Sequence, residues 1–421
     1  MIGRAGGTVT GLDARGIAAL LPAARAGDAA VVRTRDGTAI PARVVAVERG
    51  RTLLAPADDA DGVGAGDRVE LDRLALTGIL GTPLLGRALG ADGAPLDGRR
   101  PPAGSRGTLA PAIAPPAARE PIREPLWTGV RAIDGPLTVG RGARIGLFGP
   151  AGAGKSTLLE TIVAGTSADA TVVALIGERG REAERWMRRL DARTTLICAT
   201  ADRNPAERLR AADRAFAQAD ALRARGLDVL LVLDSLARVA AAAREVALAA
   251  GEAAGRGGYP PSVVGRQARL LERAGSTAAG SVTLVATVLC EGPLEDDPIA
   301  DAARAALDGH LVLSPRLAAA GWFPALDVGA SASRTFAEVA GPAHRRAAGL
   351  VRAAVAALEG SRDVRALGLD PSAGDPVLAR ALAAEPAIAA FLRQDAVPVP
   401  ADETLMLLTR IADSLDDGYL R

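Results

Sequence analysis

A glycine-rich segment that ends in lysine, serine and threonine carries the clearest chemical signal in the sequence. It consists of Gly149, Pro150, Ala151, Gly152, Ala153, Gly154, Lys155, Ser156 and Thr157. This spacing fits the pattern G-x-x-x-x-G-K-[S/T], and it lies between a strand-like run and a helix-like run. Glycines let backbone N–H groups surround phosphate oxygens, while the N-terminus of the helix adds its positive dipole end. We expect Lys155 to reach the β- and γ-phosphates of ATP and Ser156 to ligate Mg²⁺.

The lysine of this segment is unusual for a second reason. It is the single lysine among 50 lysine and arginine residues, in a chain rich in alanine, glycine and arginine. Because lysine is kept at this position against such a bias, the position is expected to need a compact point charge. The planar guanidinium group of arginine cannot provide one.

Two carboxylates follow apolar runs of strand length. Asp234 ends the run 229–233, where it could hold Mg²⁺ at the carboxyl edge of a sheet, although aspartates are common at strand ends. Glu178 follows the run 171–176 within the charged segment 177–182. A carboxylate there could orient the attacking water, but a solvated charge run explains the spacing equally well.

The rest of the pattern indicates the elements that must position these groups. Short strands are expected at 29–34, 42–47, 52–55 and 68–71, with a hairpin turn at 35–37, and a small β-barrel is the natural closure for them. A Gly/Pro-rich stretch at about 86–125 has the composition of turns and linker.

The sequence pattern changes at residue 144. Near-continuous apolar strands at 145–148, 171–176, 195–199, 229–233 and 282–289 alternate with helical segments, which predicts a parallel sheet covered on both faces. After about residue 345 the chain is Ala-rich and helical. The expected domains are a barrel (1–75), an α/β nucleotide-binding domain (76–342, with the linker at about 86–125) and a helical domain (343–421).

The composition limits the kinds of binding partner and the cellular compartment that can be expected for the protein. The net charge is +1 and aromatic residues make up 2% of the chain, and the barrel region has no cluster of aromatic and basic residues for stacking bases. We therefore expect no nucleic-acid partner. No apolar run approaches the ~20 residues of a membrane helix, and the start of the chain lacks the features of a signal peptide. A cytoplasmic protein is expected.

Several segments together resemble one known family. They lie at 123–135, 174–182, 243–252, 258–263, 270–275 and 307–310. They resemble the ATPases of type III secretion and flagellar export, which are relatives of the catalytic subunit of rotary ATP synthase, and the similarity extends from about residue 3 to 394. The resemblance implies a RecA-like P-loop ATPase domain and a homohexamer that uses ATP to release chaperones and unfold substrates. The ring would act at the cytoplasmic face of the inner-membrane export apparatus, touching the membrane only through partners.

The resemblance also assigns roles to individual residues. Glu178 matches the glutamate that orients the attacking water, and Arg179 matches an arginine near the γ-phosphate. Arg334, in the segment 331–334, matches an arginine that enters the neighbouring subunit's site, although by itself it could be a surface charge. Phe323 stands where the family usually has a tyrosine stacked on adenine, although by itself it could be a core aromatic residue.

Two departures from the family pattern concern partners. The barrel pattern begins within ten residues of Met1, where the family usually has a helical extension that binds a stator-like regulator. The loop 291–298, which faces the central stalk in relatives, carries Pro293 and Leu294 in place of paired aspartates. These departures weaken the expectation of stator and stalk partners, whereas the residues expected to carry the ATP chemistry are intact.

Three other functions remain in competition with the export motor. A catalytic subunit of a rotary or proton-coupled ATP synthase shares the core, but such synthases tend to have threonine at the Gly180 position. A ring-shaped RNA translocase also shares the core but needs base-stacking residues. An inactive structural subunit is disfavoured by the intact Lys155, Glu178 and Asp234.

Overall fold

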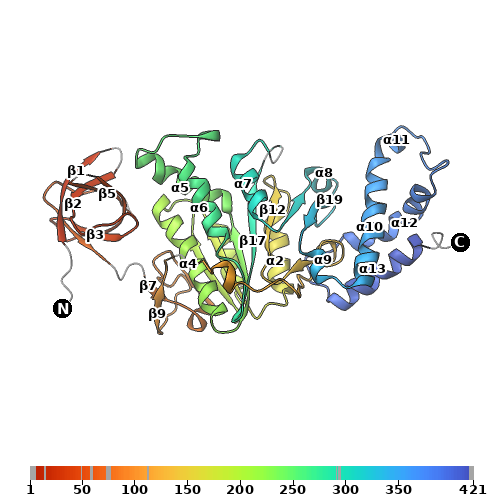
Figure 1. The fold of residues 1–421 in the computed structure, drawn as a ribbon, viewed down its shortest axis with the longest axis horizontal. Coiled ribbons are helices and arrows are strands. Elements are labelled where there is room, and N and C mark those ends of the chain that lie inside the picture. Colours follow the sequence, from red (N-terminus) through yellow and green to blue (C-terminus); the bar gives the residue numbers. More distant parts are fainter. Residues whose placement is uncertain are drawn as a thin grey trace.

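The computed structural model describes residues 6–416, apart from residues 14–15, 49, 57–59, 73–76, 111–112, 291 and 293–294. Figure 1 shows a barrel towards the N-terminus, a sheet flanked by helices in the middle, and a helical group towards the C-terminus. This architecture confirms the predicted fold class. No helix in these ranges is long and apolar enough to cross a membrane.

The barrel closes in the strand order β1-β2-β5-β4-β3-β6. Its strands are β1 (Gly6–Asp13), β2 (Gly16–Leu20), β3 (Ala29–Arg33), β4 (Ala39–Glu48), β5 (Arg51–Pro56) and β6 (Arg68–Leu71). Alternate side chains fill the interior, among them Val32, Val44 and Leu54. The four predicted strands and the turn after β3 are present. The sequence pattern misses β1 and β2 because glycines at 6, 7, 11 and 16 interrupt the alternation of polar and apolar residues.

The central sheet has nine described strands, ordered β19-β18-β12-β17-β15-β13-β14-β8, with β16 paired to β17. Their bounds are β8 (Arg87–Leu89), β12 (Arg144–Gly149), β13 (Ala170–Ile176), β14 (Thr194–Ala199), β15 (Asp228–Asp234), β16 (Gly275–Thr277), β17 (Gly280–Leu289), β18 (Gly309–Leu313) and β19 (Leu326–Ser333). Only β16 and β19 pair antiparallel with their neighbours among these strands. Each of the five strands predicted for this domain lies inside an observed one.

Helices cover both faces of the sheet, and each face has its own core. Val173 of β13 points into a core shared with α2 (Lys155–Gly165) and α3 (Gly180–Arg188), whereas the adjacent Val172 points into the opposite core. The opposite face is covered by α4 (Pro205–Arg223), α5 (Leu236–Ala249), α6 (Pro261–Leu271) and α7 (Pro298–Ala306). Burial on both faces explains why the strands read as continuous apolar runs.

The Gly/Pro-rich stretch at 86–125 contains strands as well as turns, which corrects its interpretation as turns and linker. Its strand β8 forms the edge of the central sheet beside β14, and its strand β9 (Arg106–Thr108) pairs with β7 (Thr77–Ile79). Strands of three residues are too short to give a periodic signal. A largely buried ion pair, with the Nε of Arg87 2.7 Å from the Oδ2 of Asp97, fixes β8 instead.

Smaller elements connect the sheet to the C-terminal helices. They are β10 (Pro125–Leu126), α1 (Arg131–Asp134), β11 (Val139–Gly140), α8 (Pro315–Ala319) and α9 (Phe336–Val339). The C-terminal group comprises α10 (Pro342–Gly360), α11 (Arg362–Ala366), α12 (Pro376–Leu392) and α13 (Ala401–Asp416), and it lies at the end of the molecule opposite the barrel (Figure 1). Of the loop predicted to face a stalk, residues 291, 293 and 294 lie outside the described ranges.

Candidate active site

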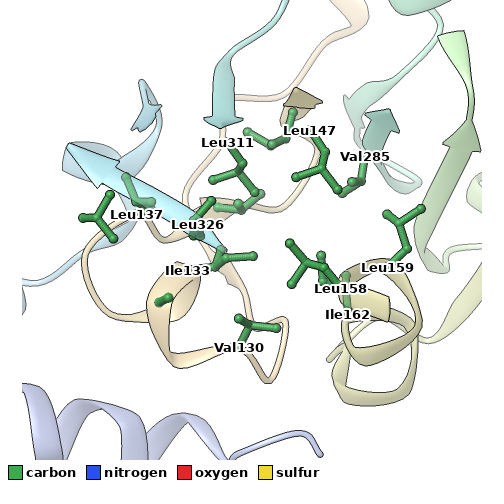
Figure 2. Close-up of a cluster of buried hydrophobic side chains, with 14 of the residues drawn as sticks. Val130, Ile133, Leu137, Leu147, Leu158, Leu159, Ile162, Val285, Leu311 and Leu326 are labelled. Atoms are coloured by element: carbon green, nitrogen blue, oxygen red, sulfur yellow. The ribbon is translucent and has the colours of Figure 1, made fainter. Parts of the chain in front are cut away.

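The glycine-rich segment connects the carboxyl end of β12 to the start of α2, as the motif requires. Strand β12 lies between β17 and β18, both parallel to it, so the segment is at the carboxyl edge of the sheet. Figure 2 shows how α2 is seated: Leu158 and Leu159 face Leu147 and Val285 of the sheet. Burying each such side chain contributes about 1.5–3 kcal/mol, so the helix N-terminus is firmly positioned.

Two glycines give the segment the curvature of a phosphate-binding loop. Gly152 and Gly154 have φ angles of 79° and 89°, a region that other residues rarely adopt. A Cβ atom on Gly154 would also lie 3.5 Å from the ring of Phe323. Side chains at these positions would strain the backbone or narrow the space between the loop and Phe323.

Lys155 is held inside the loop by backbone carbonyls. Its Nζ donates to the carbonyl oxygens of Gly149 at 2.8 Å and Pro150 at 2.6 Å. Burial lowers the pKa of its amine, while the nearby Asp234, Cys290 and Glu178 act in the opposite direction. The ammonium group is therefore anchored next to carboxylates at the mouth of the loop.

One cavity joins most of the predicted site residues. It has a volume of about 580 Å³. Its lining includes Gly152, Gly154, Lys155, Ser156, Thr157, Glu178, Arg179 and Asp234. Segments far apart in the sequence meet here because β12, β13 and β15 all end at the same edge of the sheet. The other predicted residues of the loop lie beside the cavity: Ala153 is buried, and Gly149 ends β12.

Asp234 is buried at the end of β15 and has one hydroxyl partner. Its Oδ1 accepts a 2.5 Å hydrogen bond from Thr287 of β17. Burial raises the pKa of Asp234, and this hydrogen bond opposes the shift. Thr287 is a neighbour of the site that was not predicted from the sequence. The feature that could have identified it is a polar residue inside the apolar run 282–289.

The donor set fits Mg²⁺. The hydroxyl of Ser156 and the carboxylate of Asp234 line the same cavity, and both are the hard oxygen ligands that Mg²⁺ prefers. Among the described residues, no group of three or more His, Cys, Asp or Glu side chains could hold a metal by itself. A Mg²⁺ ion that takes its remaining ligands from water and nucleotide phosphates needs no larger protein cage.

Glu178 has the properties of a catalytic base. Burial raises its pKa to about 7, and the negative charges of Asp234 and Glu182 act in the same direction. Arg238 and a hydrogen bond with Ser235 lower the pKa of Glu178, but by less. A carboxyl group poised near neutrality suits proton transfer, so the structure favours a chemical role over a solvated charge run. Ser235 and Arg238 were not identified from the sequence because polar residues after a strand-end aspartate have no distinguishing pattern.

Phe323 lies beside the loop and not in the core. Its side chain is 48% exposed, and with Gly154, Thr157 and Gln394 it lines a separate cavity of about 160 Å³. The backbone N–H of Gln394 donates to the carbonyl oxygen of Phe323 at 3.0 Å, which ties this segment to the end of α12. An exposed ring over a small cavity next to the phosphate loop is suited to stacking on a base.

Arg334 does not lie beside the nucleotide cavity of its own chain. It follows β19, and its N–H donates to the carbonyl oxygen of Asp308, just before β18 begins. Residue Gly309 lies opposite Ile145 in the register, at the start of β12, whereas the phosphate loop follows the end of β12. Arg334 is exposed and lies at the opposite edge of the sheet from its own Lys155.

The role of Phe323 can be tested by substitution. We expect Phe323→Tyr to be mild, and Phe323→Ala to raise the KM for ATP more than it lowers kcat, because stacking contributes to binding, by about 0.5–1.5 kcal/mol beyond burial. Steady-state kinetics and thermal unfolding of both variants provide the check. An alanine variant with normal KM but a lowered Tm would contradict the assignment.

Two family models match the chain. The model described as ATP synthase alpha/beta family, nucleotide-binding domain, matches residues 129–333, which include every predicted site residue except Arg334. The model described as T3SS EscN ATPase C-terminal domain matches residues 340–410.

Known proteins and solved structures give the same result. The type 3 secretion system ATPase of Pseudomonas syringae pv. tomato is 44% identical over 94% of this chain and 91% of its own length. The flagellum-specific ATP synthase of Salmonella typhimurium is 41% identical over 87% of this chain and 85% of its own. The assembled ATPase EscN of the enteropathogenic E. coli type III secretion system has a TM-score of 0.90 at 36% identity, covering 96% of this chain and 100% of that one. EscN in complex with its central stalk EscO gives a TM-score of 0.88 at 36% identity, over the same shares of both chains.

Proposed function

The chain belongs to the ATPase family of type III secretion and flagellar export systems, and we propose that it is a ring-forming motor whose ATP hydrolysis energises type III protein export. The observation that carries this proposal is the cavity that joins Lys155, Ser156, Glu178 and Asp234 at one edge of the sheet. Similarity to secretion ATPases along nearly the whole chain and to the EscN C-terminal domain favours export over rotary synthesis.

Each residue of the cavity has a distinct part in the reaction. Backbone N–H groups of the loop and Lys155 bind the β- and γ-phosphates, while Ser156 and Asp234 hold the metal. Bound Mg²⁺ supplies charge neutralisation at the phosphate oxygens. Glu178 orients the attacking water and accepts its proton. Arg179 lies at the γ-phosphate, and Phe323 stacks on adenine.

The remaining charge comes from a second subunit. Arg334 lies at the sheet edge opposite its own phosphate loop, so in a ring it can face the cavity of the next subunit. Assembly of EscN, which shares this fold, supports a homo-oligomer, and a hexamer is proposed. The ring would act at the cytoplasmic face of the inner-membrane export apparatus, with chaperone-bound substrates and a central stalk as partners.

Export itself can be tested with Lys155→Ala. This variant removes the charge that binds the β- and γ-phosphates, so we expect it to accumulate normally in cells but to abolish both ATP hydrolysis and secretion of type III substrates. Lys155→Arg keeps the charge but not its compact shape, and it should also fail. The measurement is substrate protein in the culture medium, with equal cellular levels of the wild-type and variant chains. Normal secretion by an ATPase-dead Lys155→Ala chain would contradict the proposal.

A further inference from the structure

A buried carboxylate lies next to the nucleotide cavity without lining it. Glu160 is on α2, four residues after Ser156 and therefore on the same helix face. Its side chain is only 5% exposed. Both residues line a neighbouring cavity of about 440 Å³, together with Arg181, Glu182 and Arg185. Burying a carboxylate is costly unless it is paired, so Glu160 requires an explanation.

Two arginines at the C-terminal end of α3 pair with this carboxylate. Arg185 and Arg189 each donate to the Oε2 atom of Glu160 at 2.6 Å. Arg185 lies in the last turn of α3 and Arg189 is the residue that directly follows the helix, so both reach Glu160 from the same end of α3. Charge-assisted hydrogen bonds of this kind are among the stronger ones in proteins. Glu160 therefore clamps α3 to α2 from inside the protein.

Helix α3 is directly connected to the loop that carries Glu178. It begins directly after Glu178 and Arg179, and the carbonyl oxygen of Arg179 accepts from the N–H groups of Glu182 and Ala183. The buried Ala183 and Trp186 attach α3 to the same core as Leu158 of α2. Apolar packing holds the helix against the protein but allows it to slide, whereas the Glu160 clamp fixes it at two defined points.

We propose that Glu160 is a positioning residue for hydrolysis: through Arg185 and Arg189 it sets the distance between the Glu178 loop and the phosphate loop. Ser156, at the phosphate loop, and Glu160, which holds α3, are one turn apart on α2. The same helix therefore positions both the phosphate loop and α3. A misplacement of about 1 Å can cost 10²-fold in rate, so a clamp on the helix that directly follows Glu178 and Arg179 has a large effect. This inference rests on the proposed role of Glu178.

The direct test is Glu160→Gln. It keeps the shape of the side chain but removes its charge, and we expect kcat to fall by about tenfold or more while the KM for ATP changes by less than about threefold. The pH profile gives a second readout. Glu178 faces Glu182 on α3, Asp234 at the end of β15, Ser235 directly after that strand, Arg238 on α5 and Lys155 on α2. If loss of the clamp lets α3 move outward, Glu178 becomes less buried and lies farther from Asp234, so its pKa falls and the acid limb of kcat/KM should shift to lower pH.

A matched pair of arginine variants separates positioning from general stability. Arg189→Gln removes one arm of the clamp and should give an intermediate fall in kcat; Arg189 is 56% exposed and does not line the nucleotide cavity. Arg188→Gln is the control, because Arg188 is 72% exposed on the same helix and its partner is Glu184, not Glu160. The double variant Glu160→Gln/Arg189→Gln should be no slower than Glu160→Gln alone.

The outcomes distinguish this inference from the proposed function. The positioning role would be overturned if Glu160→Gln had the kcat and the pH profile of the wild type. It would also be overturned if the effects of Glu160→Gln and Arg189→Gln on kcat multiplied in the double variant. If Glu160→Gln fails to fold, Arg189→Gln decides: normal turnover in that variant would also overturn it. Retained turnover in Glu178→Gln would instead remove the catalytic assignment on which the inference rests.

Discussion

Replacing Arg334 by alanine is expected to reduce turnover per subunit by about 10³–10⁵-fold, the range for arginine fingers elsewhere. This corresponds to about 4–7 kcal/mol of activation free energy. ATP binding and assembly should be nearly unchanged, because an arginine that arrives from a neighbour stabilises charge that develops only in the transition state.

The register of the sheet is the physical reason for this expectation. Arg334 follows the residue that pairs with Gly309, at the start of β18, whereas Lys155 follows the carboxyl end of the parallel strand β12. An arginine at the far edge of the sheet cannot assist its own phosphate loop. We therefore expect its effect on turnover to operate between subunits.

Arg316→Ala is a suitable control for this experiment. Arg316 is 43% exposed in the neighbouring connection between β18 and β19 and pairs with Glu359. Surface ion pairs of this kind contribute about 0–1 kcal/mol, so the control should keep near-normal turnover. Phosphate release, ATP binding and sedimentation of all three proteins give the comparison. An Arg334→Ala ring with turnover equal to that of the control would contradict the account.

Glu178→Gln is expected to keep ATP binding but to lose about 10²-fold or more of the turnover, because an amide cannot accept the proton of the attacking water. Binding can be measured without turnover. Lys155 is the only lysine of the chain, so protection of its side chain from amine acylation by ATP reports occupancy of the loop. Lost protection in the glutamine variant would indicate a structural role for Glu178.

The same residue gives a pH dependence with a defined sign. The pKa of Glu178 is raised to about 7, and the reaction requires its ionised form. The kcat/KM of the wild-type protein should therefore fall as the pH drops through about 7 and level off above it. In Glu178→Gln the residual rate should lack this acid limb. If the acid limb persists unchanged in Glu178→Gln, it arises from another titrating group, which would contradict the assignment to Glu178.

Much of the site could be predicted because its signals are local. The loop from Gly149 to Thr157 is a contiguous motif, and Asp234 follows an apolar strand that ends at the same sheet edge. Roles for Arg179, Glu178, Phe323 and Arg334 required the family resemblance, since single charged or aromatic residues have no pattern of their own. The structure then supplied physical support, such as the raised pKa of Glu178 and the exposure of Phe323.

The missed features depend on contacts between distant segments. Thr287 and Asp234 are 53 residues apart, and only the pairing of β15 with β17 joins them. The clamp of Glu160 depends on helix packing, which no local spacing encodes. Likewise β8 joins the sheet through tertiary contacts of a short segment whose composition is typical of turns.

The most direct test of the central claim is ATP hydrolysis by mixed rings of Lys155→Ala and Arg334→Ala subunits. Each variant alone should be nearly inactive. Equal amounts of the two variants are mixed at random into rings. A complete site forms wherever the intact phosphate loop of an Arg334→Ala subunit faces the intact Arg334 of a neighbouring Lys155→Ala subunit. Roughly a quarter of the interfaces in a cyclic ring meet this condition, so activity should approach that fraction of the wild-type rate. Verified mixed rings that recover no activity would contradict a site shared between subunits.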